Sequence, residues 1–464
     1  MWSLVSASDP LDFGRCQRSS IWRMSPVSRG RKTGKRKQDK QRGRRAITAW
    51  PRVAPSPLDR PQSVLAAFSE ALGGPRRRPG WFDESLAVVL ERAGVLMAAQ
   101  GPRELEDAAA RLLGAEQYRR LEVHESGLWF DWWFTDLAEA AVIRARDAIA
   151  GGDLDVWQPC LRLLHAMTGL GSPALAGQAH ARLGRLTKSL PRDLAESQPR
   201  WLHVLPKITA TGQLWQMHDR YGGRIAIIAG FAYPGGVDPS VFLFDIDVCG
   251  FTTLAGAGTY DEVEQAAAAW RASVGQDAAD TAPGPVQAPQ TLHALVHWNE
   301  GEETLRGDEP RPVMDNWFRA RRRLHDLAET LRKQRTPLPA WRSLYHDVQA
   351  EPSLAAFTTW YTQRHGHAPD PDATAALVYE WLEGALPGTE RVVAPARVRF
   401  IQTLMNDWIP DHPVTIGAKT LLPDWIRWNG EQDNLPTQLL DPAIATASTT
   451  TIPADPDGGP DHPL

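Results

Sequence analysis

Two apolar runs decide the fold of this chain: Arg224-Ile-Ala-Ile-Ile-Ala-Gly-Phe-Ala-Tyr233 and Val241-Phe-Leu-Phe-Asp-Ile-Asp-Val248. Gly222 and Gly223 precede the first run, and a loop rich in Pro and Gly separates the two. Short runs rich in Ile, Val and Phe and bounded by turn residues are typical of paired β-strands. We therefore predict an antiparallel hairpin, which a third strand near 251–254 would extend.

Helices are predicted on both sides of this hairpin. After it, Thr259-Tyr-Asp-Glu262 has the form of a capping box, and apolar residues follow at helical spacing: Val263, Ala266, Ala267, Trp270 and Val274. We expect this helix to pack on one face of the hairpin. A shorter helix is predicted at 212–220, before the hairpin. Residues 196–275 are thus predicted to form a small α+β domain.

Helical patterns dominate the rest of the chain, so the predicted fold class is mainly α with a small α+β insert and helical bundles at both ends. Between 61 and 195, Gly and Pro separate apolar stripes at 64–72, 86–97 and 105–113 and further helices at 136–150, 154–168 and 173–188. Residues 276–291 are predicted to be a linker. A C-terminal helical domain is predicted at 292–435, with a helical hairpin at 353–384.

The formal net charge of −4 hides a basic N-terminal segment. Residues 1–60 contain 15 Arg and Lys and four Asp, so about +11 lies there and about −15 on the remainder. High charge with little apolar content is typical of disorder, as is a segment rich in Pro, Asp and Thr. We expect a disordered basic arm at 1–60 and a disordered tail at 436–464, and Met24 is a candidate for the true start.

The cysteines, the lengths of the apolar runs and the tryptophans limit the classes of protein to which this chain can belong. Cys16, Cys160 and Cys249 lie far apart, which argues against a disulfide framework or a paired-cysteine zinc site and favours a reducing compartment. No stretch approaches the roughly 18 apolar residues of a membrane span, and no signal peptide is evident. We predict a cytoplasmic protein with no membrane association. Its 19 tryptophans are interpreted as an aromatic core, with a base-stacking surface as the alternative.

Asp245 and Asp247 are the strongest candidates for chemistry. Two positions apart on a predicted strand, their side chains share one face, opposite Phe242 and Phe244. Paired carboxylates at a strand end can hold a magnesium ion for phosphoryl transfer. However, the strand is predicted to be antiparallel, and a haloacid-dehalogenase-type phosphatase would carry Gly and Thr at the following positions. The alternative is a half-exposed strand with its acids on the solvent face.

Two histidine pairs are candidate metal ligands. His293 and His297 have the i, i+4 spacing of a zinc helix, with Glu300, Glu302 and Glu303 downstream, but the glutamate of the zinc-protease motif is absent. His365 and His367 precede Asp370 and Asp372, where Gly366 and Pro371 favour an ordinary turn between helices. No residue is predicted to be catalytic, to bind a cofactor or to ligate a metal.

The run Trp129-Phe-Asp-Trp-Trp-Phe134 is the densest aromatic segment. It is interpreted as packing between the bundle and the α+β unit, with a partner-binding patch as the alternative. Cys160 falls on an apolar helical stripe and is interpreted as an inert core thiol. Gly256-Ala-Gly258 is too short to indicate a nucleotide site, and no phosphate-binding loop, nucleophile elbow or kinase motif is present.

The basic run at 29–45 is the clearest functional signal. A flexible Arg and Lys run binds phosphates by releasing counterions, without reading sequence. Its alternative role is that of a solubilising arm. The residues predicted to contact nucleic acid are Arg29, Arg31, Lys32, Lys35, Arg36, Lys37, Lys40, Arg42, Arg44 and Arg45.

Three further stretches carry a resemblance. They are Leu243-Phe-Asp-Ile-Asp247 leading to 257–270, Pro395-Ala-Arg-Val398 leading to Asp407-Trp-Ile-Pro410, and Leu422-Pro-Asp-Trp-Ile-Arg-Trp428. Together they are similar to a group of actinobacterial proteins that has no assigned function and often begins with a basic segment like that after Met24. The resemblance covers most of 24–435 and implies no activity.

Two functional hypotheses follow from these patterns. The first is a non-enzymatic interaction protein that contacts nucleic acid through 29–45, or binds a protein partner. The second is a metal-dependent phosphoryl-transfer or hydrolytic enzyme that uses Asp245 and Asp247. An enzyme requires further acids or a lysine to converge on the two Asp side chains in a concave pocket.

Overall fold

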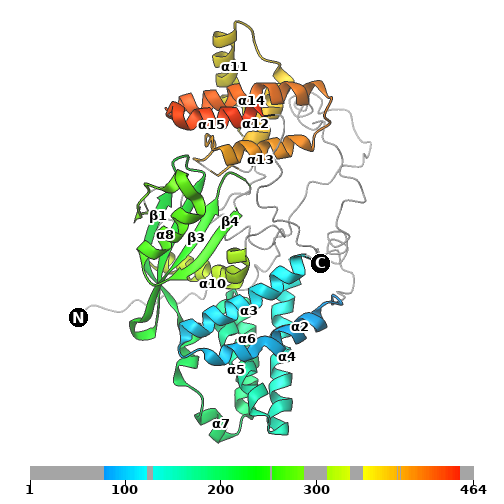
Figure 1. The fold of residues 1–464 in the computed structure, drawn as a ribbon, viewed down its shortest axis with the longest axis vertical. Helices are drawn as coiled ribbons and strands as arrows, with labels where there is room; N and C mark the ends of the chain where they lie inside the picture. The colour runs from blue at the N-terminus through cyan, green and yellow to red at the C-terminus, as the bar shows by residue number, and fades with distance from the viewer. Residues whose placement is uncertain are drawn as a thin grey trace, which may run out of the picture. The chain divides into compact units, whose positions relative to one another are not determined.

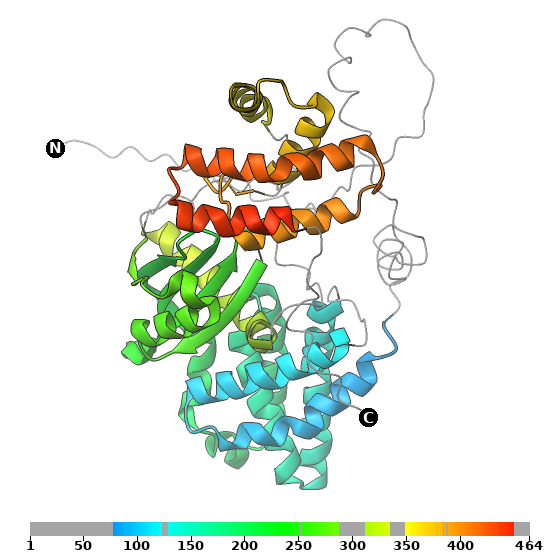
Figure 2. The ribbon, with the colours of Figure 1, turned by 45° about the horizontal axis from the view of Figure 1, so that its top comes forward.

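The computed structural model describes residues 78–122, 129–250, 253–286, 311–334, 349–383, 385–386 and 388–449 (Figures 1 and 2). These residues form a mainly α-helical structure with one antiparallel sheet, which confirms the predicted fold class. The predicted basic arm, the stripe at 64–72 and the pair His293 and His297 lie outside the described residues.

The sheet has the strand order β4-β3-β2-β1-β5, and all neighbours are antiparallel. Its strands are β1 (Thr209–His218), β2 (Arg224–Tyr233), β3 (Val237–Asp247), β4 (Thr253–Tyr260) and β5 (Gly284–Pro285). β2 pairs with β3 from Arg224 opposite Asp247 to Gly230 opposite Val241. The predicted hairpin and its third strand are therefore present, and the four longer strands follow one another as a meander.

Helices cover both faces of this sheet. Phe242, Phe244 and Ile246 of β3 belong to the main core, which also contains the N-terminal helices. Val241 and Leu243 point to the other face, where they pack with Trp270 of α8 (Val263–Val274). This alternation is the one predicted from the period of two in a strand. The predicted packing of α8 on one face of the hairpin is therefore confirmed, and the alternative of a solvent-exposed second face is wrong.

Two predictions around the sheet were wrong. The helix predicted at 212–220 is mostly strand β1, whose residues from Leu214 to His218 pair with β2. The backbone of β2 supplies long-range partners there, and these outweigh local helical preference. Thr259 is not the N-cap of α8, because β4 continues to Tyr260. Instead, Gln265 Oε1 accepts from the Asp261 N–H at 3.2 Å.

The predicted N-terminal helices are confirmed in the described residues. They correspond to α2 (Phe82–Arg92), η1 (Ala93–Ala98), α3 (Pro102–Glu122), α4 (Phe130–Gly151), α5 (Leu154–Leu170) and α6 (Pro173–Ser189). Two short elements that were not predicted follow, α7 (Arg192–Glu196) and η3 (Arg200–Lys207). Gly152 ends α4 in the left-handed conformation, with φ 72°, which glycine adopts without steric cost. Leu161, Leu163 and Leu164 of α5 are fully buried, so this helix lies at the centre of the bundle.

Helix α10 (Arg311–Lys333) shows that the predicted domain boundary at 292 was misplaced. Its Met314 and Trp317 belong to the same core as the N-terminal helices and the sheet. The backbones of α3 and α10 come close at Gly114, where an added Cβ would lie 2.4 Å from the Asp315 Cα. The sequence placed α10 in the C-terminal domain because only chain order, and no contact, was visible.

The remaining helices are α11 (Glu351–His365), α12 (Pro371–Leu382), α13 (Pro395–Asn406), α14 (Pro413–Gln432) and α15 (Thr437–Ser448). Figure 2 shows α14 and α15 side by side. The predicted hairpin of α11 and α12 is confirmed: Gly366 follows α11 with φ 76°, and the Asp370 carboxylate caps α12 by accepting from the Ala373 N–H at 2.7 Å. The tail predicted from 436 was wrong for α15, because Ala443 is fully buried. Within the predicted linker lie the 3-10 helix η5 (Gly275–Ala278) and β5.

Candidate functional site

Asp245 lies on β3 beneath α8, with its side chain almost fully buried. Its Oδ1 accepts from Trp270 Nε1 at 2.9 Å and from Arg224 Nε at 3.1 Å, and its Oδ2 accepts from Arg224 Nη2. Burial raises the pKa of Asp245, although Arg224 and Trp270 act in the opposite direction. Three protein donors therefore occupy three of the roughly four lone-pair sites of this carboxylate, and burial keeps the side chain away from an open metal site.

Asp247 is half-buried at the end of β3 and serves the local backbone. Its Oδ1 accepts from the Cys249 N–H at 2.8 Å. In the turn between β1 and β2, Asp219 Oδ1 accepts from the Gly223 N–H at 2.7 Å, and burial raises the pKa of Asp219 to about 6. Asp245 and Asp247, the candidate metal pair, thus have separate structural roles. Their predicted placement on the solvent face was wrong for Asp245.

No group of three His, Cys, Asp or Glu side chains suitable for a metal ion occurs within the described ranges. His365 Nε2 lies 3.2 Å from Asp424 Oδ2, and its ring packs on Tyr361 with the centroids 4.2 Å apart. Asp370, which follows this histidine pair in sequence, is the cap of α12. This segment is a turn between helices, in agreement with the structural interpretation of the sequence.

The aromatic run at 129–134 divides between the core and the surface. Phe130, Trp133 and Phe134 are fully buried, and the Phe134 ring lies 4.6 Å from that of Phe318 on α10. Trp129 and Trp132 are only partly buried and meet edge to face with centroids 5.1 Å apart. Three of the aromatic residues are therefore core residues that pack against Trp81 and Phe318, and the predicted packing against the α+β unit stays a prediction. The other two remain accessible in part.

The sequence did not predict the buried ionic network that α10 forms with α3. Glu106 of α3 forms an ion pair with Arg323 and accepts from the Tyr233 hydroxyl at 2.7 Å. Arg319 pairs with Asp107 and donates from Nε to Asn316 Oδ1 at 2.9 Å. The sequence feature that could have indicated this network is the cluster of arginines at 319–323 on an otherwise amphipathic helix. A sequence cannot distinguish an internal cluster of this kind from a basic surface.

Cys160 is a buried free thiol whose pKa is raised to about 11 by burial. This agrees with the predicted core position, because a nucleophilic cysteine requires a lowered pKa. His165, one turn further along α5, is also buried, and its ring lies 5.3 Å from that of His203. Burial, followed by the charge of His203, lowers the pKa of His165 to about 4.

His165 predicts a specific pH dependence of stability. The unfolded chain binds a proton at His165 below about pH 6.5, whereas the folded protein does so only near pH 4, so acidification favours unfolding in this window. Relative to a His165→Gln variant, the wild type should lose about 2 kcal/mol by pH 5. Urea unfolding of both proteins between pH 7.5 and pH 5 measures this; a constant difference contradicts it. The comparison with the variant is needed because the pKa of Asp219 is raised, so that its protonation stabilises the folded protein over the same pH range.

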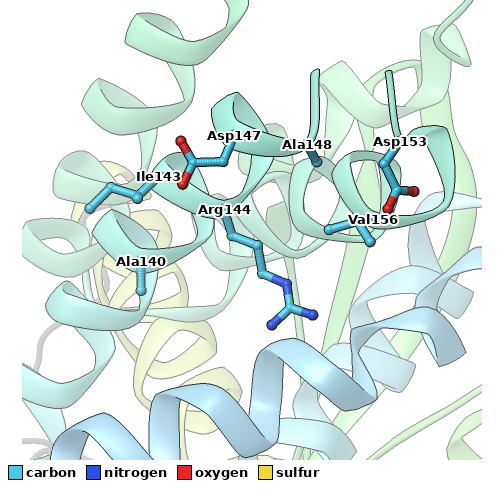
Figure 3. Close-up of a pocket in the computed structure, with 7 residues that line it drawn as sticks. All are labelled: Ala140, Ile143, Arg144, Asp147, Ala148, Asp153 and Val156. Carbon is cyan, nitrogen blue, oxygen red and sulfur yellow. The ribbon is translucent and has the colours of Figure 1, made fainter. Parts of the chain in front are cut away.

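A pocket of about 450 Å³ lies where α4 meets α5 (Figure 3). Its walls are Ala140, Ile143, Ala148 and Val156, with Arg144, Asp147 and Asp153 as the charged members. Figure 3 shows the Arg144 guanidinium extending away from both carboxylates. Because the charged groups diverge, they do not converge on a common point as acid, base and nucleophile must.

Comparison with protein-family models, with curated proteins and with solved structures finds no match for this chain. The resemblance to actinobacterial proteins therefore stays a proposal. Across the part of the chain that the structure describes, no helix is long and apolar enough to cross a membrane.

Proposed function

We propose that this chain is a non-enzymatic interaction protein that contacts nucleic acid through the basic run at 29–45. The observation that carries the proposal is the segregation of charge. Ten Arg and Lys stand within these 17 positions, with Asp39 as the single acid, whereas the remainder of the chain after residue 60 is acidic. A run of this kind attracts phosphates over distances set by the Debye length.

A second arginine cluster, on α10, supports this assignment because its charges already have partners within the protein. Arg319, Arg321 and Arg323 of α10 are buried, and each has a carboxylate partner: Asp107, Asp131 and Glu106 respectively. Although α10 resembles a basic helix in sequence, the charges of these three arginines are compensated by carboxylates of α3 and α4. The run at 29–45 is therefore the better candidate for phosphate contact. The enzymatic alternative at Asp245 and Asp247 is disfavoured because Arg224 and Trp270 occupy the Asp245 carboxylate.

A salt series tests this function. The full chain is compared with a variant in which the ten Arg and Lys of 29–45 are changed to Gln, using labelled single strands and duplexes of about 20 nucleotides. We expect the wild type to bind both, with affinity falling steeply between about 50 and 300 mM salt, and the variant to bind at least tenfold more weakly with a shallower slope. Absence of binding by the wild type, or equal slopes, contradicts the proposal.

A further inference from the structure

A second pocket, of about 420 Å³, lies among the helices α13, α14 and α15 (Figure 1). α15 packs against both of the other helices, and Gln402 of α13 holds its C-terminal end. Gln402 Nε2 donates to the Thr446 carbonyl oxygen at 3.1 Å and to that of Ala447 at 3.3 Å, which are acceptors that the end of a helix leaves without intrahelical partners. The walls of the pocket are therefore fixed by contacts within the protein.

Aliphatic side chains make up much of these walls. We call the site the C-terminal pocket, and the lining residues that carry the argument are Asn406, Ile416, Lys419, Leu422, Pro423 and Ala447. Ile416 is 55% exposed, whereas Leu422 of the same helix is buried. An apolar group that enters the pocket removes both its own surface and that of Ile416 from water, which favours binding.

The positive charge of Lys419 has no acidic partner in the part of the chain that the structure describes. Lys419 is the single charged residue among the described residues that line the C-terminal pocket. Its Nζ donates to Asn406 Oδ1 at 3.1 Å, so the ammonium lies at the edge of the pocket beside a neutral amide. Of the acids nearest in sequence, Asp407 forms no ion pair with it, and Asp424 pairs instead with Arg427. The ammonium is therefore available to an anion.

We propose that the C-terminal pocket binds a small organic acid, with one carboxylate on Lys419 and an aliphatic body against Ile416 and Leu422. The volume lies in the range of small-molecule sites. A single ammonium matches a monoanion, whereas a phosphate is usually held by several donors, commonly including the fork of an arginine. A wholly apolar ligand would cover the ammonium without compensating its charge. This inference goes beyond the proposed function and shares no residue with it.

Three probes with the same alkyl chain test the charge preference: sodium octanoate, octan-1-ol and octylamine, which is a cation at pH 7. Saturation-transfer NMR titrations with the full chain should show octanoate binding about 3- to 10-fold more tightly than octan-1-ol, and octylamine most weakly. Lys419→Gln should abolish the difference between octanoate and octan-1-ol. The matched control is Lys188→Gln, which removes an exposed lysine from α6 and should preserve that difference.

A second pair of variants tests the apolar wall. Ile416→Ser should weaken binding of both octanoate and octan-1-ol about threefold, because it removes hydrocarbon from the wall. Ile143→Ser is the control, since Ile143 is 54% exposed but stands on α4, and it should leave both affinities unchanged.

Equal binding of the three probes by the wild type overturns the inference, as does an octanoate preference that persists in Lys419→Gln. An effect of Ile143→Ser as large as that of Ile416→Ser would place the probes elsewhere and would also overturn it. If circular dichroism shows that a variant is unfolded, the order of the three probes on the wild type decides, because it requires no substitution.

Discussion

Replacing Glu106 with Gln is expected to lower the free energy of unfolding by about 3–5 kcal/mol. Glu106 is almost fully buried beside Arg323, which is also buried. Loss of the carboxylate charge leaves the guanidinium uncompensated in a low-dielectric interior, which is the costly case for a buried ion pair. Gln is chosen because its carbonyl still accepts from the Tyr233 hydroxyl, so the charge is the main change.

The ion pair also has a pH signature. Burial acts to raise the pKa of Glu106, but the charges of Arg323 and Arg319 together with hydrogen bonds from Arg323 and Tyr233 hold it below the ordinary value. A carboxyl whose folded pKa is depressed contributes stability that is present above its unfolded pKa and is lost as the pH falls through the folded pKa. The Glu106→Gln variant should lack this acid-dependent component.

Urea unfolding followed by near-ultraviolet circular dichroism measures the effect. Glu91→Gln is the matched control, since Glu91 is exposed on α2 and should change stability by less than about 0.5 kcal/mol. The double variant Glu106→Gln with Arg323→Met should recover part of the loss, because it removes both buried charges. A Glu106→Gln protein as stable as the control would show that the pair is not desolvated.

Replacing Gly114 with Ala is expected to cost about 3 kcal/mol, because α3 and α10 touch through their backbones at this point. The added Cβ would lie 2.4 Å from the Asp315 Cα and 2.5 Å from the Met314 carbonyl oxygen. Backbone atoms inside a helix cannot rotate away as a flexible side chain can. The two helices must separate, which also disturbs the ionic network that joins them.

A second glycine provides the control with the opposite sign. Gly184 lies within α6, and a Cβ added there meets nothing within 4 Å. Gly184→Ala should therefore stabilise the protein by about 0.5–1 kcal/mol through helix propensity and reduced entropy of the unfolded chain. Urea midpoints of the two variants should move in opposite directions. A Gly114→Ala midpoint above that of the wild type would contradict the close approach of α3 and α10.

Local patterns predicted those elements whose stability comes from nearby residues. The period of two in β3 placed Phe242 and Phe244 on one face and Leu243 on the other, as observed. Gly366 and Asp370 marked the end of α11 and the start of α12, because left-handed geometry and capping depend on a few neighbouring atoms. Strand β1 was missed because its partner β2 supplies its hydrogen bonds from outside the local window.

The sequence by itself determined the hairpin, the helices of the N-terminal bundle and the concentration of positive charge at 29–45. Only the tertiary structure decided that α8 buries Asp245 beneath Trp270, and that the arginines of α10 face carboxylates of α3 and α4. The reason is physical. Periodicity reports which residues of one element share a face, whereas the role of a charged side chain depends on which distant element covers that face and whether it brings the opposite charge.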